Sequence, residues 1–453
     1  MTLHPEDLAR TSVAELARLL ARGEASPAAL VDLYLQRLEA LEPGVGAFVA
    51  VYADEARQAA RQATEALAQG RRLGPLHGVP FAVKDIVDVA GKFTSYGSRS
   101  AAGRQAAESA AYVRALLAAG MILVGKTHTV EFAFGAWGTN QHMGTPRNPL
   151  RPDVPTATGG SSSGSGAAVA AGMVPWAVGT DTGGSIRIPS AFCGLTGFRP
   201  SVGRYSTEGV MPLSATLDTI GPLAHSAEDV QMLDDAVLGR HGDERAASGP
   251  DETPDLRGMR IGVVPDDGLA SDEPEVRRAY RESVRAFESL GARIGQVPLP
   301  AGLDEFAQLT PGLIACEGHA FAGPYARDPA SRMDEEVRAR FLAAEGLGPK
   351  DHAALLARRA GMMEAFNRAL SGYDALLTPT TPCVAQPLAA LADSLYNPAV
   401  YTRFVAWLGY CAIAVPNGTG RHGLPTSLQI IGLPGTDRAI MRLARAFQQA
   451  RRG

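Results

Sequence analysis

The sequence has few cysteines, little excess charge and no long apolar run, and each shortage excludes a class of protein. Its 4 cysteines among 453 residues lie far apart and form no CxxC pair, which argues against a disulfide framework and a structural zinc site. We therefore expect a reduced, cytoplasmic setting. The formal net charge is only -4, with Lys and Arg scattered along the chain, so we expect no nucleic-acid partner.

Membrane segments are also absent from the pattern. The longest nearly uncharged apolar run, residues 166–179, is too short to span a bilayer and contains Pro175. The N-terminal segment carries acids and arginines early, unlike a signal peptide. We therefore expect a soluble protein with no membrane partner, and 45% hydrophobic residues supply enough core for one large domain or two or three smaller ones.

Helix and strand signals alternate along the chain. Ser12 and Glu15 have capping-box spacing, and Ser26-Pro27 combines an N-cap residue with a proline at the first helical position. This alternation predicts an α/β protein with a helix-covered sheet. Helices are expected after these two signals and over 54–69, 107–119, 273–290, 316–370 and 437–451; strands at 79–83, 121–124, 260–266, 375–377 and 427–431; and an exposed linker at 241–256.

Lys84 is the first candidate for chemistry, because it follows the buried apolar run 79–83. Such a lysine is either a salt-bridged structural residue or a base. Burial disfavours the ammonium form, and a neutral lysine accepts a proton from a hydroxyl. Farther along, residues 134–222 are rich in Gly, Ser, Thr and Pro. Their glycines are interleaved with apolar runs, which is typical of backbone that approaches a ligand rather than of a linker.

The segment GGSSSGSG, residues 159–166, admits several interpretations. It is not a phosphate loop, because no Lys-Ser or Lys-Thr follows the glycines. Residues 160–164 match G-x-S-x-G, which would make Ser162 a nucleophile, although this short pattern carries little information in so Ser- and Gly-rich a stretch. That mechanism needs a downstream histidine, and the candidates are His225, His241, His319, His352 and His422.

A second such segment, residues 179–189, reads GTDTGGSIRIP. The two glycines before Ser185 free the backbone to point consecutive N–H groups at the negative oxygen of a tetrahedral intermediate. The alternative is a Gly-rich turn between two apolar segments. This segment alone does not separate the two interpretations.

Taken together, these segments resemble the amidase signature family of serine hydrolases. The matching stretches are PFAVKD, GGSSSGSGAAVAAG, GTDTGGSIRIPSAFCGLTGFRPSVGR, DTIGPLAHS and GLPTSLQIIG, over about residues 12–448. The resemblance implies one α/β/α sandwich domain over 1–453 around a large, mixed, twisted sheet. Its signature core lies at about 74–230 and its substrate-shaping helical region at about 316–370. Three residues depart from the family's usual Gly, Lys and Thr, namely Ser163, Arg199 and Ser201.

The resemblance also implies a Ser–cis-Ser–Lys triad that works by acyl transfer without a metal or organic cofactor. Ser185 is the expected nucleophile, Ser161 the bridging serine after a cis Gly160–Ser161 peptide, and Lys84 the base. Ser162 is then structural, and Asp181 orients the loop or Arg187. The expected oxyanion donors are the backbone N–H groups of Thr182, Gly183, Gly184 and Ser185.

The sequence constrains the identity of the substrate less than it constrains the reaction. Phe134, Gly135, Ala136 and Trp137 are expected in the loop that faces the reacting carbonyl. Phe134 and Trp137 either make the pocket apolar, which favours aryl or alkyl amides, or belong to the core. The triad does not separate carboxamides from carbamates, ureas or acylated anilines.

Three kinds of protein therefore remain in view. The first is a monomeric or homodimeric hydrolase of a small-molecule amide or carbamate. The second is the glutaminase component of a tRNA-dependent amidotransferase, whose partner proteins hold the tRNA. The third is a non-enzymatic scaffold, which the complete triad disfavours.

Overall fold

The computed structural model describes residues 6–240, 255–269 and 272–451. Within these ranges the strands form one 11-stranded sheet, in the order β1-β3-β2-β4-β6-β5-β10-β11-β9-β7-β8. The strands are β1 (Phe48–Val51), β2 (Pro80–Lys84), β3 (Ile122–Thr127), β4 (Ala177–Thr180), β5 (Thr196–Arg199), β6 (Ile220–Ala224), β7 (Arg260–Val263), β8 (Arg293–Gln296), β9 (Ala375–Pro379), β10 (Cys411–Thr419) and β11 (Pro425–Gly432).

The sheet is mixed. β2 pairs in parallel with β3 and β4, and β7 pairs in parallel with β8 and β9. The strands that connect these two parallel groups, from β4 through β6, β5, β10 and β11 to β9, pair antiparallel. The predicted α/β class with a large mixed sheet is therefore confirmed.

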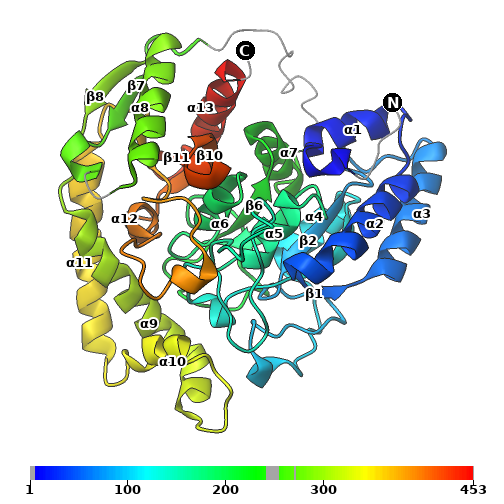
Figure 1. Cartoon of the computed structure of the whole chain (residues 1–453), viewed down its shortest axis with the longest axis horizontal. Helices are drawn as coiled ribbons and strands as arrows, with labels where there is room; N and C mark the ends of the chain where they lie inside the picture. The colour runs from blue at the N-terminus through cyan, green and yellow to red at the C-terminus, as the bar shows by residue number, and fades with distance from the viewer. Residues whose placement is uncertain (1–5, 241–254, 270–271, 452–453) are drawn as a thin grey trace.

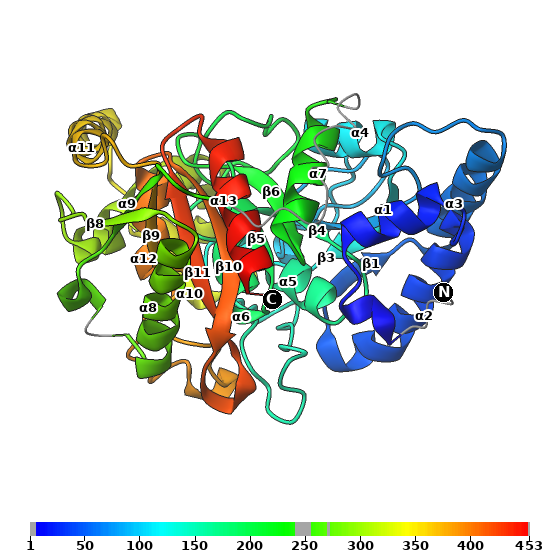
Figure 2. The ribbon, with the colours of Figure 1, turned by 90° about the horizontal axis from the view of Figure 1, so that it is seen from above.

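Helices cover both faces of this sheet. α5 and α6 contact each other on one face, whereas α13 contacts both α7 and α8 on the other. Figures 1 and 2 show α1–α3 at one end of the molecule and α9–α11 at the other. The α-helices are α1 (Val13–Ala21), α2 (Pro27–Val45), α3 (Ala53–Ala68), α4 (Ala111–Ala118), α5 (Ser163–Ala170), α6 (Arg187–Phe192), α7 (Ala227–Val237), α8 (Pro274–Ser289), α9 (Leu303–Arg327), α10 (Glu335–Leu342), α11 (Pro349–Ala369), α12 (Val400–Trp407) and α13 (Asp437–Ala450); short 3-10 helices are Asp7–Ala9, Arg99–Ala101, Glu131–Ala133, Asp266–Leu269, Leu388–Ala390 and Arg421–Gly423.

The capping signals operate as the sequence predicts. The Ser12 hydroxyl accepts the Glu15 N–H at 3.1 Å at the start of α1. The Ser26 hydroxyl accepts the Ala29 N–H at 3.2 Å, with Pro27 as the first residue of α2. Each cap satisfies one of the backbone donors that a helix N-terminus leaves without a partner.

Some predicted boundaries are wrong. The helix predicted over 107–119 begins only at Ala111, because the N–H groups of Ala106 and Ala110 donate to the carbonyls of Lys92 and Asp88 instead. The helical region predicted over 316–370 begins earlier, at Leu303, and is interrupted twice. The sequence predicts no helix or strand at several observed elements, namely β1, β4, β5, β6, β8, β10, α5, α6, α7 and α12. Residues 241–254 of the predicted linker lie outside the described residues.

The parallel pairing of β2 and β4 positions the candidate site. Lys84 is the last residue of β2 and Thr180 the last residue of β4. Because parallel strands end at the same edge of a sheet, both side chains lie together at the carboxyl edge. The Gly-rich turn 181–186 follows β4 directly and leads into α6. In the described chain, no helix is long and apolar enough to cross a membrane.

Candidate active site

Lys84 is fully buried and faces hydroxyl groups. Its ammonium nitrogen lies 2.7 Å from Ser161 Oγ and 2.8 Å from Thr180 Oγ1. Burial lowers the pKa of Lys84 to about 7, although the carboxylates of Asp181 and Asp218 act in the opposite direction. A lysine with such a pKa exchanges a proton near neutral pH.

Ser161 is held rigidly on the other side of this contact. The Gly160–Ser161 peptide is cis, as the resemblance implies. The Ser161 carbonyl accepts hydrogen bonds from Val130 N–H and Thr129 Oγ1, both at 3.1 Å. Gly160 also needs to be glycine, because a Cβ there would lie 2.7 Å from the backbone nitrogen of Gly138.

Ser185 lies beside this pair and is partly exposed. The N–H of Ser162 donates to the Ser185 carbonyl at 3.3 Å, which joins the two serine-bearing segments. The structure therefore brings Lys84 and Ser161 into direct contact and places Ser185 on the adjacent turn. Within the described chain, the hydroxyls of Ser161 and Ser185 form no hydrogen bond with each other.

Ser162 does not have the surroundings of a nucleophile. It is fully buried, its hydroxyl accepts the Thr180 N–H at 3.3 Å, and it lies 3.4 Å from the Thr180 carbonyl. These contacts tie the start of α5 to the end of β4. In the part of the chain that the structure describes, no histidine ring contacts this hydroxyl.

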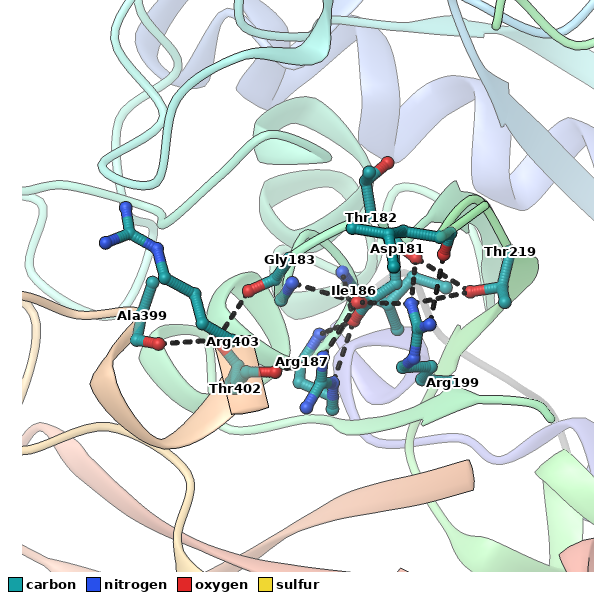
Figure 3. A network of polar contacts seen from close by, with 12 residues as sticks. Asp181, Thr182, Gly183, Ile186, Arg187, Arg199, Thr219, Ala399, Thr402 and Arg403 are labelled. Carbon is teal, nitrogen blue, oxygen red and sulfur yellow. Dashed lines mark hydrogen bonds and ion pairs between the residues drawn. The ribbon is translucent and has the colours of Figure 1, made fainter. Parts of the chain in front are cut away.

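Asp181 organises the turn that carries Ser185 (Figure 3). Its carboxylate accepts two hydrogen bonds from the Arg187 guanidinium, at 2.8 and 2.9 Å, and one from Arg199 at 3.1 Å. It also accepts the Gly184 N–H at 2.8 Å and the Ile186 N–H at 3.3 Å. Burial alone would raise the pKa of Asp181, but the two arginines outweigh that effect and lower it. The carboxylate therefore stays ionised and fixes the turn.

This bonding changes the expected set of oxyanion donors. The Gly184 N–H is already bound by Asp181, whereas the N–H groups of Thr182, Gly183 and Ser185 have no hydrogen-bond partner among the described residues. Gly183 is partly exposed, and a Cβ there would meet other atoms only at 3.7 Å or more. Gly184 has φ 135°, and a Cβ there would collide with Thr402 Oγ1 at 2.2 Å. The glycine pair therefore has two separate roles, access at Gly183 and close packing at Gly184.

Thr182 and Asp218 form a further contact that the sequence did not suggest. Thr182 Oγ1 donates to Asp218 Oδ1 at 2.5 Å. Asp218 also accepts the N–H groups of Leu213 and Ser214, at 2.9 and 3.0 Å. Burial raises the pKa of Asp218 to about 6, despite these hydrogen bonds. The side chain of Thr182 is thus anchored, which orients its N–H.

The predicted pocket loop separates into two environments. Phe134 is buried and packs on Phe341 with 5.1 Å between ring centroids, so it joins the core. Trp137 is half-buried and stacks on Phe192 at 5.8 Å. Gly135 and Ala136 are also half-buried, and the Ala136 carbonyl accepts the Gly160 N–H at 2.7 Å. The loop therefore lies against the cis peptide next to Ser161.

The three departures from the family pattern are all buried. Arg199 donates to the Asp181 carboxylate and to the Leu217 carbonyl, the latter at 3.0 Å. Ser201 donates to Asp437 Oδ2 at 2.7 Å, which joins the end of β5 to the start of α13. Ser163 opens α5, and its hydroxyl has no hydrogen-bond partner in the described structure.

The sequence analysis did not predict the contacts that more distant segments make with the site. Thr402 of α12 donates to the Gly183 carbonyl at 2.7 Å, and Thr180 and Asp218 act as described above. A sequence signal existed only for Thr180, which stands one residue before the Gly-rich turn. In the described residues, no group of three or more His, Cys, Asp or Glu side chains is placed to hold a metal ion.

Comparison with known proteins agrees with this fold. The family model described as Amidase matches residues 29–441. The chain is 35% identical to the A subunit of a glutamyl-tRNA(Gln) amidotransferase from Symbiobacterium thermophilum, over 97% of this chain and 96% of the relative. It is 34% identical to a 2-amino-5-chloromuconic acid deaminase from Comamonas testosteroni, over 96% and 95%. The crystal structure of an amidase superposes with a TM-score of 0.86 at 32% identity, over 97% of this chain and 100% of that chain.

These matches define an enzyme that hydrolyses carbon–nitrogen bonds of amides. The chain belongs to the amidase signature family. The relatives differ in the activities that their names record, so membership establishes the reaction class and leaves the substrate open.

Replacing Asp181 with asparagine is expected to destabilise the fold strongly. Asp181→Asn leaves two buried arginines without a charged partner, which costs about 3–5 kcal/mol. Urea unfolding followed by circular dichroism measures this change. Asp54→Asn is the control, because the Asp54 side chain is fully exposed and its ion pair with Arg57 is long, at 3.8 Å. Equal stability of the two variants would show that the arginines do not need Asp181.

Proposed function

We propose that this enzyme cleaves carboxamide C–N bonds of small aryl or alkyl amides by acyl transfer through Lys84, Ser161 and Ser185. The observation that carries the proposal is the 2.7 Å contact between Lys84 and Ser161, made by a buried lysine that no carboxylate pairs with in the described residues. Such a lysine is available as a base rather than held as a structural cation.

The proposed steps follow from these positions. Neutral Lys84 accepts the proton of Ser161, and Ser161 accepts the proton of Ser185. The Ser185 oxygen attacks the carbonyl carbon, and the resulting oxyanion accepts hydrogen bonds from backbone N–H groups of the turn. The proton returns to the leaving nitrogen, the amine departs, and water releases the acyl group from Ser185. The second proton transfer requires the Ser185 hydroxyl to turn toward Ser161 once substrate is bound.

Partial exposure of Ser185 and Gly183 supports this direction of attack. Both residues are accessible, whereas Lys84 and Ser161 are fully buried beneath them. A substrate carbonyl that reaches Ser185 therefore meets the Gly183 backbone at the same time. The half-buried Trp137 supplies an apolar surface near this position, which suits an aryl or alkyl group.

Ser185→Ala is expected to abolish amide hydrolysis without unfolding the protein. Removal of a nucleophile lowers kcat by on the order of 10⁴-fold or more in serine hydrolases. Hydrolysis of acetanilide and butyramide measures activity, and circular dichroism measures folding. Ser163→Ala is the matched control, because its hydroxyl is buried nearby and has no hydrogen-bond partner among the described residues. Full activity of Ser185→Ala would exclude Ser185 as the nucleophile.

The pH profile tests the base. Since Lys84 must be neutral to accept a proton, kcat/KM should rise with pH and level off above about 7, the pKa of Lys84. The Asp218 carboxylate raises the pKa of Lys84, so Asp218→Asn should move the acidic limb to lower pH. Asp54→Asn should leave the limb in place. A limb that stays fixed, or moves to higher pH, in Asp218→Asn would contradict the assignment of Lys84 as the base.

A second candidate is the glutaminase component of a tRNA-dependent amidotransferase. The observation in its favour is the 35% identity with such an amidotransferase component along nearly the whole of both chains. A panel of aliphatic amides, anilides, carbamates, ureas and free glutamine separates the candidates. We expect the purified chain to hydrolyse simple amides without a partner. Release of ammonia from glutamine, with no hydrolysis of the other compounds in the panel, would favour the amidotransferase instead.

A further inference from the structure

Among the residues that the structure describes, Arg403 carries a positive charge without a counter-ion. It lies in α12 and is half-buried. Its Nη1 donates to the Ala307 carbonyl of α9 at 3.0 Å, and among the described residues no carboxylate pairs with it. Burial and the charge of Arg340 both lower its pKa, to about 10, so the group remains cationic at neutral pH.

Arg403 lies in the part of α12 that contacts the turn carrying Ser185. The preceding residue, Thr402, donates to the Gly183 carbonyl at 2.7 Å, and Thr310 of α9 donates to the Arg403 carbonyl at 3.3 Å. Figure 3 shows that the Arg403 side chain extends away from the Asp181 network, which already holds two arginines of its own. The guanidinium is therefore free of that network.

Arg340 of α10 is a second cation, close enough to Arg403 to lower its pKa. Its Nη1 donates to the Phe134 carbonyl, and a Cβ on Gly135 would lie 3.2 Å from the same nitrogen. Its ion pair with Glu336, at 2.6 Å, lies on the exposed side of α10. Because the loop after Phe134 contacts Gly160, Arg340 also lies close to the candidate site.

Two acidic residues of α9, Glu305 and Glu317, already have other partners. Glu305 of α9 pairs with Arg358 of α11, and Glu317 of α9 accepts Thr216 Oγ1 at 2.5 Å and His352 Nε2 at 2.9 Å. Burial of an uncompensated cation costs free energy, and proteins pair or coordinate such charges. An anionic group on the substrate would compensate Arg403 through a charge-assisted, bidentate hydrogen bond.

We infer that the amide substrate carries a carboxylate, which Arg403 binds while Arg340 adds positive charge. This inference rests on the proposed amidase function and specifies its substrate class. A carboxylate separated by a few carbons from the scissile carbonyl would hold that carbonyl over Ser185 and Gly183. Neutral amides of the same length would lack this anchor.

Matched substrate pairs test the inference. The anionic members are succinamate, glutaramate and 4-acetamidobenzoate, and their neutral counterparts are butyramide, pentanamide and acetanilide. We expect the wild-type enzyme to prefer at least one anionic member, and Arg403→Gln to lower kcat/KM for that member by on the order of 10- to 100-fold, mainly through KM. The neutral counterpart should change little, and Arg403→Lys should recover part of the loss.

Arg368→Gln is the matched control, since it removes an exposed arginine of the neighbouring helix α11 whose ion pair with Glu364 is long, at 3.8 Å. It should leave the anionic preference unchanged. Calorimetric binding of succinamate, glutaramate and 4-acetamidobenzoate, and of their neutral counterparts, to Ser185→Ala adds a measurement that does not depend on turnover. There, the Arg403→Gln change should weaken binding only of the preferred anionic compound.

The outcomes separate the two proposals. If wild-type enzyme hydrolyses the neutral amides and shows no anionic preference in rate or binding, the inference fails and the amidase function stands. Equal losses for both members of a pair in Arg403→Gln would indicate a structural role and also overturn it. If Ser185→Ala keeps its activity, the proposed mechanism fails, and the binding preference alone decides whether Arg403 recognises a carboxylate.

Discussion

The buried ion pairs of Asp181 with Arg187 and Arg199 are the constraint on which the rest of the site depends. All three side chains are inaccessible to solvent. Removing such charges from water is costly unless every donor and acceptor is satisfied. Here Arg187 also donates to Gln429 Oε1 of β11 at 2.6 Å and to the Thr402 carbonyl of α12 at 3.1 Å. One carboxylate thus ties the Ser185 turn to strand β11 and helix α12, far away in the sequence.

The same carboxylate takes part in setting the state of Lys84. Asp181 and Asp218 both favour the ammonium form, whereas burial disfavours it. The two arginines engage the Asp181 carboxylate directly, and the only hydrogen-bond partners of Lys84 among the described residues are hydroxyl groups. Lys126, on the adjacent strand β3, provides the contrast. It is equally buried but contacts Asp85 at 2.8 Å, and that carboxylate favours its charged form. The alternative interpretation of Lys84, a salt-bridged structural lysine, therefore describes Lys126.

This contrast shows which contacts of the site the sequence predicts and which it does not. Lys84 and Asp85 are neighbours in the chain, yet successive side chains at a strand end point to different places, and the pairing of β2 with β3 gives Asp85 to Lys126. The short segments around Ser161 and Ser185 carry their local geometry in their own glycines, so the sequence alone was enough to propose these two residues. Asp218 and Thr402 reach the turn from the loop that leads into β6 and from α12. No local pattern marks them, because tertiary packing alone creates their contacts.

The candidate site has two parts, one built on the sheet and one on the helices that face the Ser185 turn. The turn, the cis peptide and the buried lysine come from strands and helices of the sheet, whose positions hydrogen bonding and core packing fix. The surface that faces the turn comes from α9, α10 and α12, where Ile314 and Thr310 approach Gly183 and Arg340 contacts the loop beside Gly160. Ile314 and Thr310 of α9 lie near Gly183 and form no hydrogen bond with Asp181 or Lys84 among the described residues, so substitutions there would alter this surface and leave those two residues in place. Under the proposed mechanism, relatives about one-third identical to this chain can share a reaction and still differ in substrate, because the reacting groups and the surface that faces them come from different parts of the same fold.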